Sequence, residues 1–285
     1  MDREQQEQLQ AYFAKTAKNE IRIRRKRAQA PLPAMCSRIG GKPSVPKDFI
    51  WPYYDCVDIF DGKRKHLPLS FIAQIKLSEI ADLDVDGFLP QNGVLSFFYE
   101  LDIMDWGNDP ANKGSAVVLY FPDESALHIA DYPVDMKEKV MVPEYEIEFE
   151  QRLTVPEYDR FEHRRIDPDE YAELAHKCGY VPNKFGDHTK LFGFPDVIQG
   201  PMESDCEAIS RGYHRAPSGE ELDDIDKKAS EWMLLFQMAS LTDDEPGEYY
   251  HPCKFGCYGN IYYWIKRNDL LARKFENAWL ILQCY

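Results

Sequence analysis

Three side chains that could bind a metal ion lie close together near the carboxyl end of the chain, namely His251, Cys253 and Cys257. A structural zinc site normally has four ligands, and in zinc-binding proteins these usually come from two pairs of Cys or His residues that are each close in the sequence. No second close pair of cysteines accompanies this one. We therefore favour the interpretation that these cysteines are ordinary buried thiols over the interpretation that they bind a metal ion. The sequence predicts no cofactor.

Two glutamines, Gln74 and Gln237, each interrupt an apolar run that is predicted to be a strand. A buried amide without a partner costs about 1–3 kcal/mol, so each side chain must find hydrogen bonds. Either each amide joins its strand to a nearby loop rich in glycine and proline, or both amides face a cavity and hold a polar ligand. We favour the first alternative. The second would add Trp51 and Trp232 as ligand-contacting residues.

The segments around these glutamines resemble each other. After each apolar run a glycine opens an aromatic run, with Gly93 before residues 94–98 and Gly259 before residues 260–264. A repeat of this kind predicts two similar structural halves, one over about residues 30–155 and the other over about residues 156–285. We expect the halves to form one compact unit over residues 1–285.

The pattern of apolar residues indicates an α+β fold. Aromatic residues are abundant, with 17 tyrosines and 16 phenylalanines, which favours strands over a helical bundle. The spacing of apolar residues predicts an N-terminal amphipathic helix over residues 2–18 and a final helix over about 269–278, capped by Asn268. Between these helices, short apolar runs separated by turns predict mostly antiparallel strands.

Two of the predicted strands carry opposite charges. Residues 144–150 alternate glutamates with apolar residues, and residues 21–25 alternate isoleucines with Arg22 and Arg24. Opposite charges facing each other on neighbouring strands stabilise a sheet. We therefore expect Arg22 or Arg24 to lie across from one of these glutamates.

The overall charge and the cysteines limit the partners and the compartment. A formal net charge of −15 would repel nucleic-acid phosphates but permits a basic protein partner. The chain shows neither a secretory apolar segment nor a run long enough to span a membrane. Seven scattered cysteines indicate reduced thiols, and we expect a cytoplasmic protein. The sequence does not indicate an oligomeric state.

Several blocks of the sequence resemble the YwqG-like family, a bacterial domain of unknown function. The blocks span residues 37–43, 51–52, 69–75, 89–99, 191–199, 232–237, 256–265, 269–270 and 279–284. Together they cover roughly residues 30–285 in order. The resemblance implies a duplicated architecture, and it brings no established activity, cofactor or catalytic residues.

The sequence also lacks the common catalytic motifs. Neither the phosphate-binding G-x-x-x-x-G-K-[ST] and G-x-G-x-x-G patterns nor the hydrolase G-x-S-x-G and H-E-x-x-H patterns occur. Loops instead carry large aromatic residues such as Trp51 and Trp106, which could line a groove. We therefore predict a cytoplasmic binding module without catalytic turnover, with a basic protein as partner. The alternative is a small-molecule enzyme or sensor with a pocket between the halves near Gln74 and Gln237.

Overall fold

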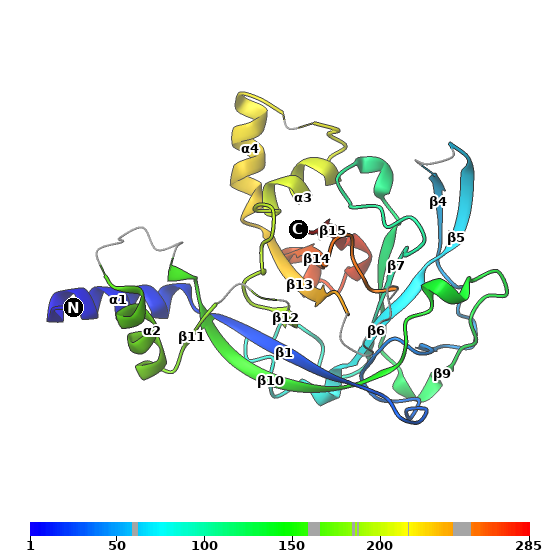
Figure 1. Ribbon diagram of the computed structural model, residues 1–285, viewed down its shortest axis with the longest axis horizontal. Helices are drawn as coiled ribbons and strands as arrows, with labels where there is room; N and C mark the ends of the chain where they lie inside the picture. The colour runs from blue at the N-terminus through cyan, green and yellow to red at the C-terminus, as the bar shows by residue number, and fades with distance from the viewer. Residues whose placement is uncertain (59–61, 159–165, 184–185, 187, 216, 242–251) are drawn as a thin grey trace.

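The computed structural model describes residues 1–58, 62–158, 166–183, 186, 188–215, 217–241 and 252–285. Most of its strands belong to one large sheet (Figure 1). These strands are β1 (Lys18–Arg27), β2 (Arg38–Ile39), β6 (Ser70–Lys76), β7 (Val94–Tyr99), β8 (Ala116–Phe121), β10 (Tyr145–Val155), β11 (Val181–Pro182), β12 (Thr189–Phe192), β13 (Trp232–Ala239), β14 (Asn260–Lys266) and β15 (Trp279–Gln283). Two short pairs lie outside it, β3 (Ser44–Val45) with β9 (His128–Ile129) and β4 (Tyr53–Val57) with β5 (Arg64–Pro68).

Helices are few and short among the described residues. The α-helices are α1 (Arg3–Thr16), α2 (Pro168–Lys177), α3 (Glu203–Ser210), α4 (Glu220–Ala229) and α5 (Arg267–Leu271). The 3₁₀ turns are η1 (Leu77–Glu79), η2 (Pro110–Asn112), η3 (Glu124–Ala126), η4 (Glu138–Val140) and η6 (Phe275–Asn277). None of these helices combines the length and the apolar composition that crossing a bilayer requires.

The large sheet curves around one main core. Its strand order is β15-β14-β13-β12-β1-β10-β2-β6-β7-β8, with every neighbouring pair antiparallel, and β11 adds to β10 in parallel. Strands far apart in this order meet inside, because the rings of Phe97 in β7 and Phe236 in β13 lie 4.5 Å apart. The Tyr263 hydroxyl of β14 donates to the Phe98 carbonyl, 3.1 Å away. The sheet is therefore nearly closed like a barrel, and the predicted class of mostly antiparallel sheet with an N-terminal helix is confirmed.

The β15 end of this sheet is covered by the loop that follows β7. The Leu282 N–H donates to the Trp106 carbonyl at 2.9 Å, and the Trp279 indole N–H donates to the Gly107 carbonyl at 2.9 Å. Gly107 has a φ of +76°, and a methyl group there would overlap the carbonyl oxygen of Leu280. Only glycine allows this loop to approach the edge strand so closely.

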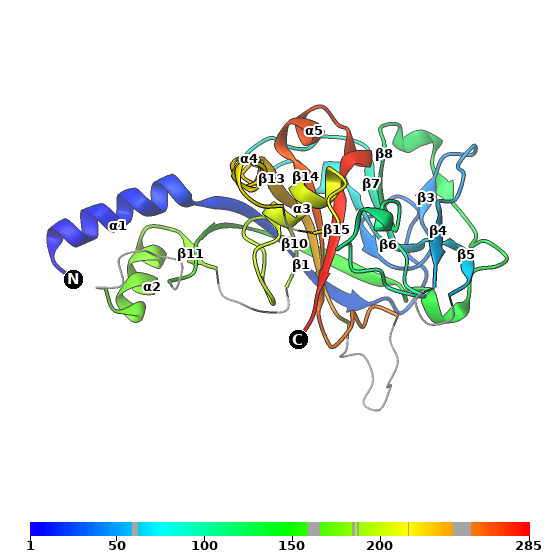
Figure 2. The same ribbon diagram turned by 90° about the horizontal axis from the view of Figure 1, so that it is seen from above.

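Helices α1 and α2 form an arm at one end of the β1–β10 ribbon (Figures 1 and 2). A capping box between Asp2 and Gln5 begins α1. Phe13 of α1 packs edge-on against Tyr171 of α2, with ring centroids 5.0 Å apart. The α-amino group of Met1 pairs with Glu170 at 2.8 Å. The arm thus has a small apolar core of its own, separate from the core inside the sheet.

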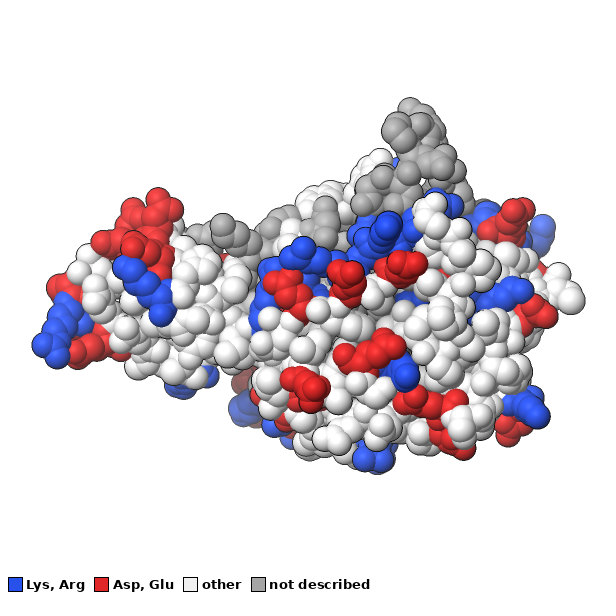
Figure 3. Space-filling view, turned by 90° about the horizontal axis from the view of Figure 1, so that it is seen from below, with Lys and Arg blue, Asp and Glu red and all other residues white. Residues whose placement is uncertain are grey.

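Strands β1 and β10 face each other with opposite charges. Their register places Arg22 opposite Glu150 and Arg24 opposite Glu148. The Arg24 guanidinium pairs diagonally with Glu150 at 2.7 Å, which confirms the expected cross-strand pairing. Figure 3 shows acidic and basic side chains side by side on the lower face, along which these strands run in Figure 1. The acidic face of β10 therefore lies opposite the basic face of β1.

The predicted final helix is wrong in its length and its cap. The segment forms only the short helix α5, followed by the separate turn η6. Lys266 stands at the N-cap position of α5 without a side-chain hydrogen bond, and Asn268 lies inside the helix. Phe275 is buried in the main core, so tertiary packing interrupts the helix there.

Candidate functional site

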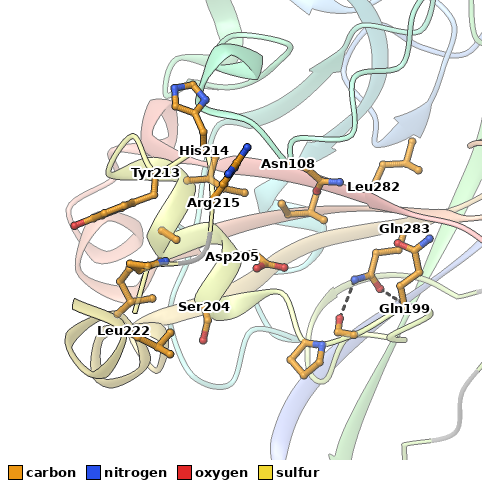
Figure 4. A pocket seen from close by; sticks show the side chains of 17 residues that line it. Asn108, Gln199, Ser204, Asp205, Tyr213, His214, Arg215, Leu222, Leu282 and Gln283 are labelled. Carbon is orange, nitrogen blue, oxygen red and sulfur yellow. Dashed lines mark hydrogen bonds between the residues drawn. The ribbon is translucent and has the colours of Figure 1, made fainter. Parts of the chain in front are cut away.

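A cavity of about 380 Å³ lies between α3, α4 and β15 (Figure 4). We call it the α3–α4 pocket. Its apolar wall comes from Ile209 of α3, Ile225 of α4 and Ile281 of β15. A volume and a mixed lining of this kind are typical of ligand sites in proteins.

Ion pairs fix the two helices that frame the pocket. Arg211 at the end of α3 pairs with Asp224 of α4 at 2.6 Å, and it also contacts Glu207 one turn earlier in α3. The Ser204 hydroxyl donates to Asp226 at 2.9 Å. These contacts hold α4 against α3, so the apolar wall is already formed without a ligand.

Asp205 is the acidic residue of the pocket lining, and its position on α3 is exposed. It lies in the first turn of α3, among the labelled lining residues of Figure 4. Among the described residues, none donates a hydrogen bond to its carboxylate and none forms an ion pair with it. Although Asp205 is exposed, partial desolvation beside the pocket raises the pKa of its carboxyl group, and the nearby charge of Glu203 raises this pKa further. A bound cation would favour the charged form and oppose that shift.

The rim of the pocket carries further polar side chains. Asn108 and Arg215 line it, and neither has a hydrogen-bond partner for its side chain among the described residues. His214 Nδ1 lies 3.1 Å from Asp109 Oδ2, which connects the loop between α3 and α4 to the loop after β7. A backbone N–H from Ala111, together with His214, lowers the pKa of Asp109. The rim is thus built from two segments that are distant in the sequence.

Gln74 lies outside this pocket, in a buried set of contacts that we call the Gln74 network. Its Oε1 accepts from the Ser44 N–H at 2.9 Å, and its Nε2 donates to the Cys36 carbonyl at 2.7 Å. On the neighbouring strand Arg38, opposite Gln74 in register, donates to Glu144 at 2.8 Å. The amide therefore joins β6 to the loops on either side of β2.

Gln237 makes corresponding contacts in what we call the Gln237 network. Its Oε1 accepts from the Asp196 N–H at 2.9 Å, and its Nε2 donates to the His188 carbonyl at 2.8 Å. Lys190, opposite Gln237 in register, pairs with Asp196 at 3.0 Å and with Glu20 at 3.2 Å. All three charged side chains are fully buried.

A histidine completes the Gln237 network. His188 Nδ1 lies 2.9 Å from Asp196 Oδ2, and 29% of the histidine side chain is exposed. Burial raises the pKa of Asp196, but the hydrogen bond from His188 and the charge of Lys190 outweigh burial and leave this pKa lowered. His188 does not line the α3–α4 pocket, so this pair lies outside the candidate site.

The two tryptophans named from the sequence both commit their indole N–H groups to the protein. Trp51 donates to the Leu69 carbonyl at 2.9 Å, and Trp232 donates to Glu207 at 2.7 Å. Trp232 also lines a second cavity beside β8, whereas Trp51 packs against Phe98. The structure therefore does not bring Gln74, Gln237, Trp51 and Trp232 together around one cavity.

The three metal-ligating candidates differ in their surroundings. Cys253 is buried in the main core, where burial raises the pKa of its thiol, and Cys257 is exposed. His251 lies outside the described residues. Within the described ranges, no three His, Cys, Asp or Glu side chains are grouped to hold a metal ion.

Sequence reasoning missed both Asp205 and the charged part of the Gln237 network. Asp205 lies in a helix of only eight residues that follows a loop rich in glycine and proline. The network left a weak signal, because Lys190 lies inside the short strand Thr189–Phe192, directly after His188. A lysine buried in the middle of a sheet must have acidic partners, but the sequence could not identify them.

Comparison with protein-family models identifies the family of this chain. A family model described as a domain of unknown function, DUF1963, matches residues 37–284. The chain belongs to the DUF1963 family. The match includes the α3–α4 pocket and both glutamine networks except Glu20 and Cys36. No curated protein matches the chain significantly.

Proposed function

We propose that this DUF1963 protein is a non-catalytic binding module for a basic partner protein. A lysine or arginine side chain of the partner enters the α3–α4 pocket and pairs with Asp205. The observation that carries the proposal is the unpaired carboxylate of Asp205, whose raised pKa a bound cation would lower again.

The shape of the pocket supports a long basic side chain as the ligand. Such a side chain carries its charge on an apolar stem. Ile209, Ile225 and Ile281 would contact the stem while Asp205 meets the charged end. The side-chain amide of Asn108 offers a further hydrogen-bond acceptor at the rim. Arg215 at the rim has the same sign of charge as the proposed ligand and would repel it. The ligand therefore approaches most favourably from the side of Asp205.

The surface charge supports the same choice of partner. The chain carries a formal net charge of −15. The acidic face of β10 lies opposite the basic face of β1, whereas the first turn of α4 beside the pocket adds Glu220, Glu221 and Asp223. Such a field would attract a basic protein and speed its association at low salt.

Titration with a fluorescent peptide of alternating lysine, leucine and glycine tests the proposal. We expect Asp205→Asn to weaken binding of this peptide about tenfold or more, because a charge-assisted hydrogen bond is lost. Asp223→Asn is the matched control, since it removes the same charge from an exposed position of α4 that does not line the pocket. Arg215→Gln should strengthen binding. Equal losses in the two aspartate variants would contradict the proposal, because general charge would then explain the affinity.

We also propose that the chain consists of two halves that arose by duplication. The contacts of Gln74 and Gln237 support this, since each accepts from a loop N–H at 2.9 Å and each lies opposite a basic residue of the neighbouring strand. A bulge also lies just before each glutamine, between Phe71 and Ala73 in β6 and between Leu234 and Phe236 in β13. We infer that the family is that of the YwqG-like proteins.

We also place the protein in the cytoplasm. All seven cysteines are free, which fits a reducing compartment. Gln74, Gln237 and Trp51 have no ligand-binding part in the proposed function, because their polar groups bond to the protein itself.

A further inference from the structure

A cavity of about 420 Å³ lies beside β8 and β15, and we call it the β8–β15 cavity. Ala116 and Val117 of β8 form one side of it, and Trp279 of β15 forms another. The turn η6 also lines it and packs against β8, with the ring centroids of Phe275 and Tyr120 5.6 Å apart. The cavity shares no lining residue with the α3–α4 pocket. Because η6 closes it on the β8 side, the cavity has room for a small molecule and not for a further strand.

Two tryptophans give the cavity an apolar wall. The indole N–H of Trp232 donates to Glu207 at 2.7 Å, and that of Trp279 donates to the Gly107 carbonyl at 2.9 Å. Both polar groups are therefore bound within the protein, and the two rings offer the cavity apolar surface only. Aromatic walls of this kind favour an aromatic ring of a ligand, which packs on them offset or edge to face.

Ser115 brings an unpartnered hydroxyl to the cavity. The residue is only 3% exposed, and its hydroxyl makes no hydrogen bond with any described residue. The hydroxyls of Ser70 and Ser96 likewise have no partner among the described residues, but they are fully enclosed. The Ser115 oxygen keeps a small accessible area, and the cavity is the space beside it. A buried hydroxyl without a partner costs free energy, so a polar group of a ligand is favoured at this point.

The charges around the cavity leave a negative surplus. The ammonium group of Lys266 pairs with Glu207 at 2.7 Å and is therefore already neutralised. Asp269 of α5 is half-buried and Glu276 of η6 is exposed, and neither carboxylate has a partner in the part of the chain that the structure describes. Lys113 is the remaining cation of the lining. A positively charged group of a ligand is therefore favoured beside Asp269.

We propose that the β8–β15 cavity binds a small aromatic amino alcohol. The aromatic ring of this ligand packs against Trp232 and Trp279. Its ammonium group pairs with Asp269, and its hydroxyl forms a hydrogen bond with Ser115. Each part of the ligand thus meets a group of the lining that the fold itself leaves without a partner or exposes as apolar surface. The site does not include Asp205, so it stands or falls separately from the α3–α4 pocket.

Calorimetric titration of the full chain with phenylethanolamine tests the proposal. Phenylethanediol, in which a hydroxyl replaces the amine, should bind about tenfold more weakly, because it lacks the charge that pairs with Asp269. Asp269→Asn should weaken the binding of phenylethanolamine by a similar factor. Asp82→Asn is the matched control, since it removes the same charge from an exposed position outside the cavity. Asp205→Asn should also leave this binding unchanged, which separates the test from that of the proposed function.

A comparison of two amines tests the part played by Ser115. Phenylethylamine lacks the hydroxyl, and the wild type should bind it several-fold more weakly than phenylethanolamine. Ser115→Ala should bind the two amines equally, whereas a defect in folding would weaken both and keep their ratio. In NMR spectra the indole N–H signals of Trp232 and Trp279 should shift when phenylethanolamine binds. The signal of Trp51, which does not line the cavity, should stay in place.

Four results would overturn the proposal. The first is that phenylethanolamine does not bind at concentrations up to about 5 mM, and the second is that phenylethanediol binds as tightly. The third is an equal loss of affinity in Asp269→Asn and Asp82→Asn. The fourth is a Ser115→Ala protein that keeps the preference for the amine with the hydroxyl.

Discussion

The Gln74 and Gln237 networks have corresponding backbone contacts but different charges. In each, a glutamine in a strand of the large sheet accepts from a backbone N–H outside that sheet at 2.9 Å. Around Gln74 that N–H belongs to Ser44, a neutral residue. Around Gln237 it belongs to Asp196, whose carboxylate is buried with Lys190 and bonded to His188. The same local geometry therefore supports an ion pair with a partly exposed carboxylate in one place and a buried ionic network in the other.

The two networks differ in how far their charged groups are buried. The Arg38–Glu144 pair in the Gln74 network keeps its carboxylate partly in contact with solvent, with 21% of the Glu144 side chain exposed. Lys190, Glu20 and Asp196 have no exposure at all. Buried charges are costly to leave unpaired, so the Gln237 network should respond to substitution more strongly than the Gln74 network.

Removal of the buried lysine should have the largest effect. Lys190→Met takes the cation away from two buried carboxylates, and we expect a loss of about 3–5 kcal/mol in the free energy of unfolding. Arg38→Met is the matched change in the Gln74 network and should cost less, because Glu144 can turn to water. Urea unfolding followed by fluorescence measures both. Equal losses would mean that the ionic character of the Gln237 network is unimportant.

Replacing each glutamine should have an intermediate effect. Gln237→Leu and Gln74→Leu each leave a buried loop N–H without an acceptor, which costs about 1–3 kcal/mol. We expect the larger loss for Gln237→Leu, because Asp196 Oδ2 also loses a donor that lies 2.8 Å away. The same unfolding measurement tests the order. A larger loss for Gln74→Leu would show that Asp196 does not depend on the amide.

The smallest effect should be a difference in acid sensitivity. The pKa of Asp196 in the folded protein is lowered below the ordinary value of 3.8. The carboxylate therefore contributes stability at higher pH, and this contribution is lost as pH falls below about 4 and through the folded pKa. Asp196→Asn should be less stable at neutral pH and lose less further stability on acidification. Ser44→Ala, at the corresponding place in the Gln74 network, should leave the slope of stability with pH unchanged. If the free energy of unfolding fell with the same slope below about pH 4 in the wild type and in Asp196→Asn, this assignment would be contradicted.

Local patterns in the sequence predicted the parts of the fold that depend on neighbouring residues. The charge pairing of β1 with β10 follows from the alternation of charged and apolar residues in the two strands. The final helix failed because Phe275 is recruited into the core, which no local pattern reveals. The need of Gln74 and Gln237 for partners was also predictable, since burying an amide has a known cost.

The candidate site was far less predictable. Asp205, Asn108 and Ile281 come from three distant segments, and only the curved sheet brings them to one cavity. A single acidic residue in an acidic chain carries no sign that it will stay unpaired. The place of β8 at the end of the sheet was equally hidden, because no local pattern shows which strands will be neighbours.

The carboxyl group of Asp205 gives the most direct test of the proposed function. Its side-chain carbon can be followed by NMR through a pH titration of the full chain, with and without the lysine-containing peptide, and Asp223 serves as an internal reference. We predict that the bound peptide lowers the pKa of Asp205 and leaves the pKa of Asp223 nearly unchanged. An Asp205 pKa that stays the same while the peptide is bound would contradict the account.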